Sequence, residues 1–185
     1  MTQTATPQRY GLISQLFHWS VVLMMIAMLV TDSLRSAAPK DSELRTEWLH
    51  LHISLGILLF LIVIVRILWS RISTQPAPIP GSPWIMLAAK AVHLMLNLAT
   101  LLVPVFGYLR VVSKGRTVEF FGVQVPSLIG ESPQINDLMH ILHGEPMEIF
   151  FYVVIGLHVV AALWHQYTLR DGTLERMLPW GRTAG

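Results

Sequence analysis

Eight histidines are spread through this sequence, and most lie within or at the edge of a long apolar stretch. A polar side chain at membrane depth is costly and usually functional, although any single histidine could simply hydrogen-bond a carbonyl of a neighbouring helix. Imidazole is a common axial ligand of haem iron, and helix bundles build cofactor sites from side chains on facing helices. As a set, the histidines therefore indicate bound haem more strongly than any one does alone. They are His18, His50, His52, His93, His140, His143, His158 and His165.

The absence of cysteine narrows the redox chemistry that the chain can support. Without thiols there are no disulfides, no thiolate-bound metals, no iron-sulfur clusters and no covalent attachment of c-type haem. Histidine remains as the ligand for a redox metal, because the nine methionines are scattered over apolar faces and are interpreted as packing residues. The expected cofactor is b-type haem.

The composition is that of a membrane protein. Of the 185 residues, 53% are hydrophobic and 13% charged, which is too apolar for an ordinary soluble domain and suits one membrane domain over residues 1–185. The net charge is +2, but Lys and Arg are scattered between apolar runs rather than clustered into a stripe. Nucleic-acid binding is therefore excluded as a function.

Four apolar stretches approach the roughly 20 residues that a helix needs to cross a bilayer. Because lipid offers the backbone no hydrogen bonds, each stretch should be helical, with Pro104 kinking the third. The predicted fold class is an all-α integral membrane protein, a four-transmembrane-helix bundle enclosing two b-type haems. Segment 114–137 is predicted to be a long loop with a short strand at 118–125. The predicted spans are residues 13–31, 48–69, 87–112 and 146–167.

The membrane orientation is weakly encoded, because Lys and Arg are divided almost evenly between the two sides. We expect both termini to be cytoplasmic. The first apolar stretch is longer than the core of a signal peptide, so we expect it to be retained. The predicted topology is multi-pass.

A haem held between helices requires two histidines at matched depth. Fifteen residues separate His143 from His158, so on one continuous helix they would lie about 60° apart around it and about 22 Å apart along it. His18 and His52 each lie near the start of a span, hence on opposite sides of the membrane. Depth therefore pairs His52 with His143 on the outer side. On the inner side His18 pairs with either His158 or His165, and depth alone slightly favours His165.

The remaining histidines are weaker candidates. His50 and His52 lie about 200° apart on a helix, so only one of them can face the bundle. Gly56, one turn beyond His52, would let a porphyrin approach closely, which favours His52. His140 is interpreted as a loop histidine near the interface, and His93 has no evident axial partner.

Short motifs around the histidines are specific when taken together. They are RYG (9–11) and FHW (17–19), LHISLGILL (51–59) with Arg66, VHL (92–94) before Pro104 and Gly107, and LHVVAALWH (157–165) followed by DGTLERM (171–177). With them the sequence resembles, over nearly its whole length, the prokaryotic cytochrome b561 family. In pattern it is close to the di-haem cytochrome b subunits of formate dehydrogenases and nickel-iron hydrogenases.

The resemblance implies haem ligands on the first, second and fourth helices. Carried over to this sequence, they are His18, His52, His143 and His158, so the resemblance selects His158 over His165. In that family the two ligands of the fourth helix usually lie one residue closer together than the fifteen residues found here. His140 is therefore kept as the alternative to His143.

The resemblance also implies a membrane electron carrier. Family members are thought to pass electrons between a small donor at the outer surface and ubiquinone of the respiratory chain, and one activity in the family is oxidation of superoxide to oxygen. Two six-coordinate haems in series suit electron transfer, since neither leaves an open site for oxygen.

The two ends of such an electron path suggest further site residues. An anionic donor would be attracted by Arg110, Lys114 and Arg116, unless these are ordinary flanking charges. On the inner side a quinone site is predicted from Arg71, His93 and His165, because a histidine can supply protons near neutral pH.

Two other functions compete with this one. The chain could be the cytochrome b membrane anchor of a separate dehydrogenase or hydrogenase, although its short terminal segments offer little docking surface. A haem-free transporter with a histidine proton relay would require inverted repeats or broken paired helices, which the sequence lacks. The expected partners are membrane lipid, ubiquinone and either a small anionic donor or a redox protein. An isologous homodimer is compatible with the sequence.

Overall fold

The computed structural model describes residues 8–180 and confirms an all-α bundle of four long apolar helical stretches, each able to cross a membrane. Helix α1 covers Leu12–Ala37, α2 covers Glu43–Ile72 and α3 covers Pro83–Val112. The fourth stretch consists of α4, Pro133–Leu142, and α5, Glu145–Trp164, which continues into a π-helical turn, η1, at His165–Leu169. A short 3₁₀ turn, η2, follows at Glu175–Met177.

The helices begin where the sequence offers caps. Ser42, Ser82 and Ser132 precede α2, α3 and α4, and each hydroxyl accepts a hydrogen bond from the backbone N–H three residues later. Prolines follow two of these caps, at the first helical position, where a missing N–H costs nothing. These local signals extend the helices beyond the predicted spans.

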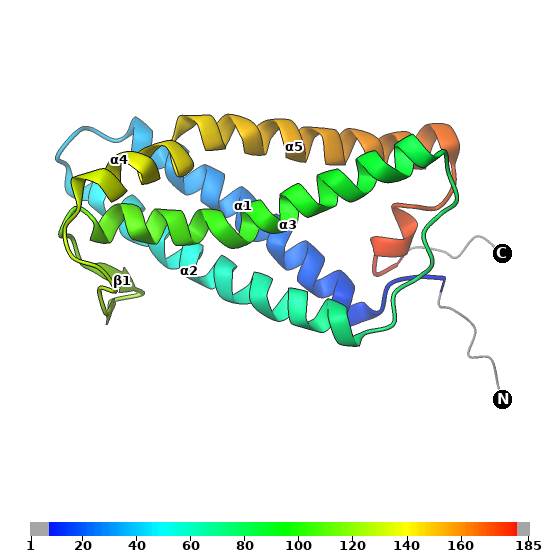
Figure 1. Ribbon diagram of the computed structural model, residues 1–185, viewed down its shortest axis with the longest axis horizontal. Coiled ribbons are helices and arrows are strands. Elements are labelled where there is room, and N and C mark those ends of the chain that lie inside the picture. Colours follow the sequence, from blue (N-terminus) through cyan, green and yellow to red (C-terminus); the bar gives the residue numbers. More distant parts are fainter. Residues whose placement is uncertain (1–7, 181–185) are drawn as a thin grey trace.

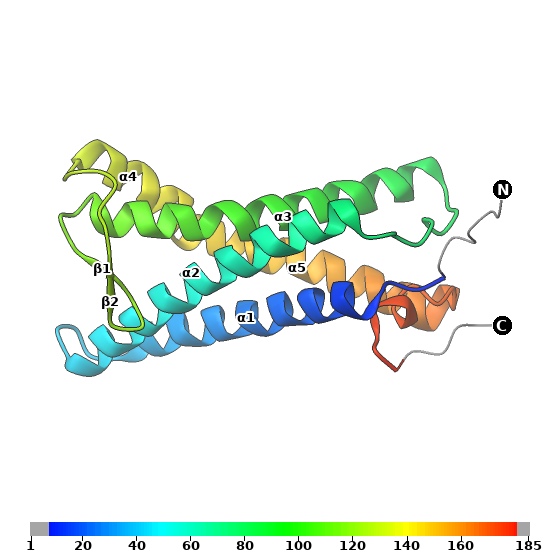
Figure 2. The ribbon, with the colours of Figure 1, turned by 90° about the horizontal axis from the view of Figure 1, so that it is seen from below.

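The packing of the helices is uneven (Figures 1 and 2). Helix α1 lies along α2, α2 along α3, and α3 along α4 and α5, whereas α5 stands further from α1 and α2. A core of Val21, Leu59 and Val63 joins α1 to α2, and the surrounding apolar side chains include Met24 and Met28. The backbone of α5 therefore lies further from α1 and α2 than from α3.

The predicted fourth span is confirmed by α5 and η1, but the assumption that His143 and His158 lie on one continuous helix is wrong. His143 has φ −140° and ψ 48°, outside the helical range, and it ends α4; Gly144 then caps α5. Pro146, in the first turn of α5, lacks the N–H that a continuous helix would use and would clash with the carbonyl of Leu142. A Cβ at Gly144 would lie 2.2 Å from the His140 carbonyl oxygen, so the chain can break in this way only at glycine. The geometry calculated for His143 and His158 on one helix therefore does not apply.

The predicted loop at 114–137 is shorter than expected, because α4 begins at Pro133, and the predicted strand is a small hairpin. Strands β1, Val118–Phe120, and β2, Val123–Val125, pair in antiparallel register around the turn at Phe121 and Gly122, both with positive φ. The hydroxyl of Ser54 in α2 donates to the Glu119 carbonyl at 3.3 Å and accepts from the Phe121 N–H at 3.0 Å. The hairpin is thereby fixed against α2.

The two ends of the described chain meet at one end of the bundle, which we call the terminal end. The Tyr10 N–H donates to the Arg176 carbonyl at 3.2 Å, and the buried Gln15 amide donates to the carbonyls of Tyr10 at 2.8 Å and Arg176 at 3.3 Å. The Trp19 indole donates to the Met177 carbonyl at 2.8 Å. The opposite end, with the α1–α2 loop and the β1–β2 hairpin, is called the hairpin end.

Replacing Gln15 tests how the terminal end is held. We expect Gln15→Leu to lower the free energy of unfolding by about 1–3 kcal/mol, because buried carbonyls lose their donor. Trypsin should also cut faster after Arg176. Gln75→Leu is the matched control, since the Gln75 amide bonds only to Ser73 in its own segment. Equal thermal stability and equal cleavage rates of the two variants would contradict this assignment.

Candidate functional site

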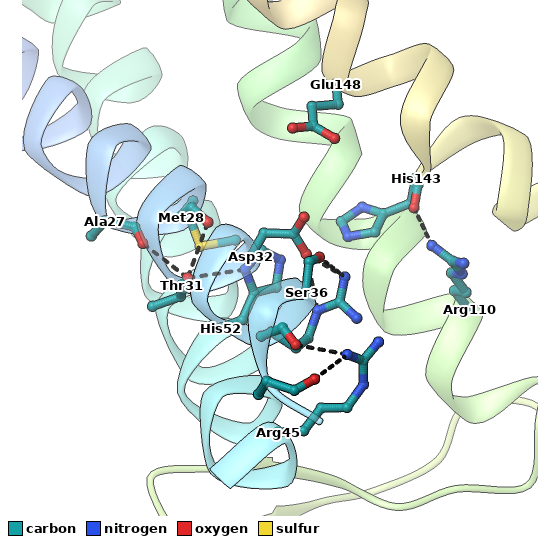
Figure 3. A network of polar contacts seen from close by, with 12 residues as sticks. Ala27, Met28, Thr31, Asp32, Ser36, Arg45, His52, Arg110, His143 and Glu148 are labelled. Atoms are coloured by element: carbon teal, nitrogen blue, oxygen red, sulfur yellow. Dashed lines mark hydrogen bonds and ion pairs between the residues drawn. The ribbon is translucent and has the colours of Figure 1, made fainter. Parts of the chain in front are cut away.

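One pair of histidines lies toward the hairpin end. His52 from α2 and His143 from the α4–α5 break face each other across the bundle, with ring centroids 6.2 Å apart and planes at 75°. In Figure 3 the two imidazoles come from different helices, and dashed lines join Thr31 to His52 and the His143 carbonyl to Arg110. The break in the fourth span thus places an imidazole where a continuous helix would not.

His52 is oriented by a threonine of the first helix. The Thr31 hydroxyl donates its single hydrogen to the backbone of its own helix, with the Ala27 carbonyl at 2.8 Å and the Met28 carbonyl at 3.0 Å. Its oxygen lies 3.1 Å from Nδ1 of His52 and is left to accept from that nitrogen. The proton of His52 therefore sits on Nδ1, and the lone pair of Nε2 is free to bind a metal.

His143 is oriented by the backbone of α3. Its Nδ1 lies 2.8 Å from the Val103 carbonyl oxygen, which can only accept, so Nδ1 carries the proton here too. The close approach requires Gly107, because a Cβ there would lie 2.7 Å from the imidazole. Both histidines of this pair therefore present Nε2 as the free nitrogen.

Charged side chains surround this pair. Arg110 of α3 donates to the His143 carbonyl, which has no helical N–H donor because the helix breaks there. Asp32 and Arg35 form an ion pair of 2.6 Å on α1, and Arg45 caps that helix by donating to the carbonyls of Arg35 at 2.8 Å and Ala38 at 3.1 Å. Of the cations predicted to attract a donor, Arg110 is half-buried in this contact, while Lys114 and Arg116 are exposed.

A second cluster of histidines lies toward the terminal end. His18 of α1 and His158 of α5 have ring centroids 6.2 Å apart, with planes at 59°. His93 of α3 also reaches His158, with ring centroids 5.3 Å apart, a contact that the sequence did not indicate. His165 takes no part in this cluster; it lies beyond His158 in the π-helical turn.

Arg66 of α2 accompanies the second cluster. It is close enough to His18, His93 and His158 to act on each of them electrostatically. Neither of the two ion pairs within residues 8–180 includes it. A guanidinium at membrane depth is expensive and marks a functional site, with an anionic partner the natural complement.

The spacing of the two pairs suits a metal between imidazoles. A metal-bound imidazole nitrogen lies about 2.0–2.1 Å from the ion, so two imidazoles on opposite sides of one ion have ring centroids about 6 Å apart. Both the His52–His143 and the His18–His158 pairs have this spacing. In the described part of the chain no group of three or more His, Asp or Glu side chains could hold an ion by itself. Two-imidazole sites of this kind fit haem, whose macrocycle supplies the other ligands.

The three residues predicted for a quinone site are not joined by any contact among the described residues. Arg71 is exposed at the end of α2, and His93 belongs to the second cluster. The Nδ1–H of His165 donates to the Asp171 carboxylate at 2.5 Å, and the Thr173 hydroxyl donates to the same carboxylate at 2.6 Å.

A cavity of about 350 Å³ opens close to His165. The cavity is lined by Gln166, which follows His165 in the chain, and by Gly172. Gly172 lies between Asp171 and Thr173, whose side chains are hydrogen-bonded to each other. Other lining residues are Tyr167, Arg170 and Glu175.

Sequence reasoning missed several of these residues. Thr31 and Val103 were not identified from the sequence, and Arg66 was noted only as part of the family pattern, because the contacts of these residues depend on how the helices are rotated. Asp171, Gly172 and Thr173 form a turn whose side chains bond to each other, and the Asp-Gly pair is a turn signal that could have been recognised. His50 and His140 are both exposed and take part in neither cluster.

The comparisons with known proteins identify one cytochrome family. The family model described as prokaryotic cytochrome b561 matches residues 9–180. Cytochrome b561 homolog 2 of Escherichia coli is 34% identical, over 96% of this chain and 95% of its own, and cytochrome b561 homolog 1 is 29% identical, over 88% and 92%. A probable superoxide oxidase of Yersinia pestis is 30% identical, over 93% of this chain and 97% of its own.

The Asp171 turn predicts a dependence of stability on pH. Burial raises the pKa of Asp171, but hydrogen bonds from Thr173 and His165 outweigh it and hold the pKa below its usual range. A lowered pKa means that the carboxylate stabilises the fold above its ordinary pKa of about 4, and that this stabilisation is lost as the pH falls through the lowered value.

Asp171→Asn should therefore lower the free energy of unfolding at pH 7 by about 1–2 kcal/mol. Its melting temperature should be lower than that of the parent. The difference should vanish in acid, as melting curves across the pH range will show. Asp137→Asn, at an exposed position of α4, is the control. A difference that persists undiminished below about pH 3 would refute this role for Asp171.

Proposed function

The chain belongs to the prokaryotic cytochrome b561 family of membrane electron carriers, and on that basis we propose that it holds two b-type haems and passes electrons from a donor at its hairpin end to ubiquinone. The observation that carries the proposal is the presence of two histidine pairs with the same 6.2 Å spacing, one toward each end of the bundle. When bound, b-type haem with two imidazole ligands supplies reversible one-electron transfer.

His52 and His143 are the proposed ligands at the hairpin end, and His18 and His158 those at the terminal end. In the first pair both Nδ1 atoms are engaged, which supports Nε2 as the binding atom. His93 is closer to His158 than opposite ligands of one ion would be, at 5.3 Å, and is assigned a place beside the haem.

Arg66 is the proposed partner of a haem propionate at the terminal end. A carboxylate would neutralise a guanidinium that neither ion pair of the described residues includes. The position of Arg66 near His18 and His158 supports this assignment.

The proposed donor is a small anion, and superoxide fits the charges at the hairpin end. Lys114 and Arg116 are exposed there and would raise the local concentration of an anion. One relative is a probable superoxide oxidase. The reaction balances as two superoxide ions giving two molecules of oxygen, while their two electrons and two protons reduce one ubiquinone to ubiquinol.

The proposed quinone site lies at the terminal end and uses Arg71, His93 and His165. His165 would deliver a proton to the quinone, and Asp171, bonded to its Nδ1, would orient the ring and stabilise its charge. We place this end, with both termini, on the cytoplasmic side of the bacterial inner membrane. Protons for the quinone would then come from the cytoplasm.

The haem content of purified, haem-supplied protein tests the ligand assignment. We expect two b haems per chain from the pyridine haemochrome and the reduced-minus-oxidised spectrum. His52→Ala and His143→Ala should each lose the same haem, and His18→Ala and His158→Ala the other, because each variant removes one of the two side chains that would hold that haem. His50→Ala and His140→Ala are the matched controls and should keep both. A His158→Ala protein with both haems would sink the assignment.

The activity itself can be measured in vesicles that contain ubiquinone. Superoxide generated outside should form ubiquinol, and Lys114→Gln with Arg116→Gln should slow the reaction several-fold at low salt and less at high salt, since exposed charges are screened. Lys90→Gln, exposed in the first turns of α3 at the other end, is the control. Haem-loaded protein that ignores superoxide but accepts electrons from a dehydrogenase would support the anchor-subunit function instead.

A further inference from the structure

Thr31 has a contact that the fold of its own helix does not require. Its side chain is 3% exposed, and the bonds to the Ala27 and Met28 carbonyls already satisfy the hydroxyl hydrogen. Thr100 of α3 shows the ordinary case: it is also buried, at 5% exposure, its hydroxyl bonds the Leu96 carbonyl at 2.7 Å, and it has no hydrogen bond to a histidine among the described residues. Thr31 differs in that its oxygen also lies 3.1 Å from Nδ1 of His52.

The two histidine pairs differ in how they are held. At the hairpin end, His52 is bonded to Thr31 and His143 to the Val103 carbonyl. Within residues 8–180, neither His18 nor His158 is held by such a bond; their ring contacts are with each other and with aromatic neighbours such as Trp19. They also have the Arg66 guanidinium nearby.

We propose that Thr31 is a positioning residue that accepts a hydrogen bond from His52, orients its Nε2 toward the haem iron and lowers the reduction potential of the hairpin-end haem. An imidazole whose second nitrogen donates a hydrogen bond is a more basic ligand, and a more basic ligand stabilises ferric over ferrous iron. The proposal rests on the proposed function, because it assumes that His52 ligates haem.

The asymmetry gives the electron path a direction. Hydrogen-bonded ligands lower the potential at the hairpin end, whereas among residues 8–180 no such bond holds His18 or His158 at the terminal end. An electron that enters at the hairpin end therefore moves downhill toward the terminal end. Thr31 contributes to this driving force without touching donor or quinone.

The test is a spectroelectrochemical titration of both haems in purified full-length protein. Thr31→Val keeps the shape of the side chain and removes the hydroxyl, so it should shift one midpoint potential upward and leave the other unchanged. The shifted haem should be the one that His52→Ala removes. Thr31→Ser keeps the hydroxyl and should restore the parent value, and Thr100→Val should move neither potential.

Other results decide the matter as clearly. Loss of only the His52-dependent haem from Thr31→Val, with recovery in Thr31→Ser, would also support positioning of His52. Two haems with unchanged potentials in Thr31→Val would overturn the inference and leave the proposed function intact. Parent protein that binds no haem when haem is supplied would overturn both.

Discussion

Lipid offers an imidazole no hydrogen bond, so each histidine that this chain places at membrane depth has to find its partner within the protein. The structure meets that constraint in two ways. At the hairpin end, each Nδ1 donates to an oxygen of α1 or α3, which leaves Nε2 as the free nitrogen of each ring. At the terminal end, three imidazoles meet near Arg66 and contact one another.

The break in the fourth span follows from the same constraint. A continuous helix would direct the side chain at position 143 by helical rotation alone, whereas the non-helical backbone there lets the ring reach the Val103 carbonyl. Gly107 makes room for the ring, and Arg110 bonds the carbonyl that the break exposes. Pro146 and Gly144 thus serve to position one imidazole.

The chemistry divides between the two ends of the bundle. The hairpin end combines exposed cations with a rigidly held histidine pair, which suits contact with an anionic donor and a low-potential site. The terminal end combines a half-buried guanidinium with the His165–Asp171 pair and its neighbouring cavity, which suits the proposed electron delivery to an acceptor that also takes up protons. Helices α1, α2, α3 and α5 connect the two ends across the bilayer.

The sequence by itself determined the four apolar helices, the Ser and Pro signals that begin them, and the placement of His18 and His52 at opposite ends. Hydropathy and helical rise are local properties, so these features can be read from residues alone. The spacing of residues along the sequence could not decide between His158 and His165. It also could not predict that His93 contacts His158 or that Thr31 contacts His52. Those contacts depend on how each helix is rotated about its axis and where the fourth one breaks, and only tertiary packing decides that.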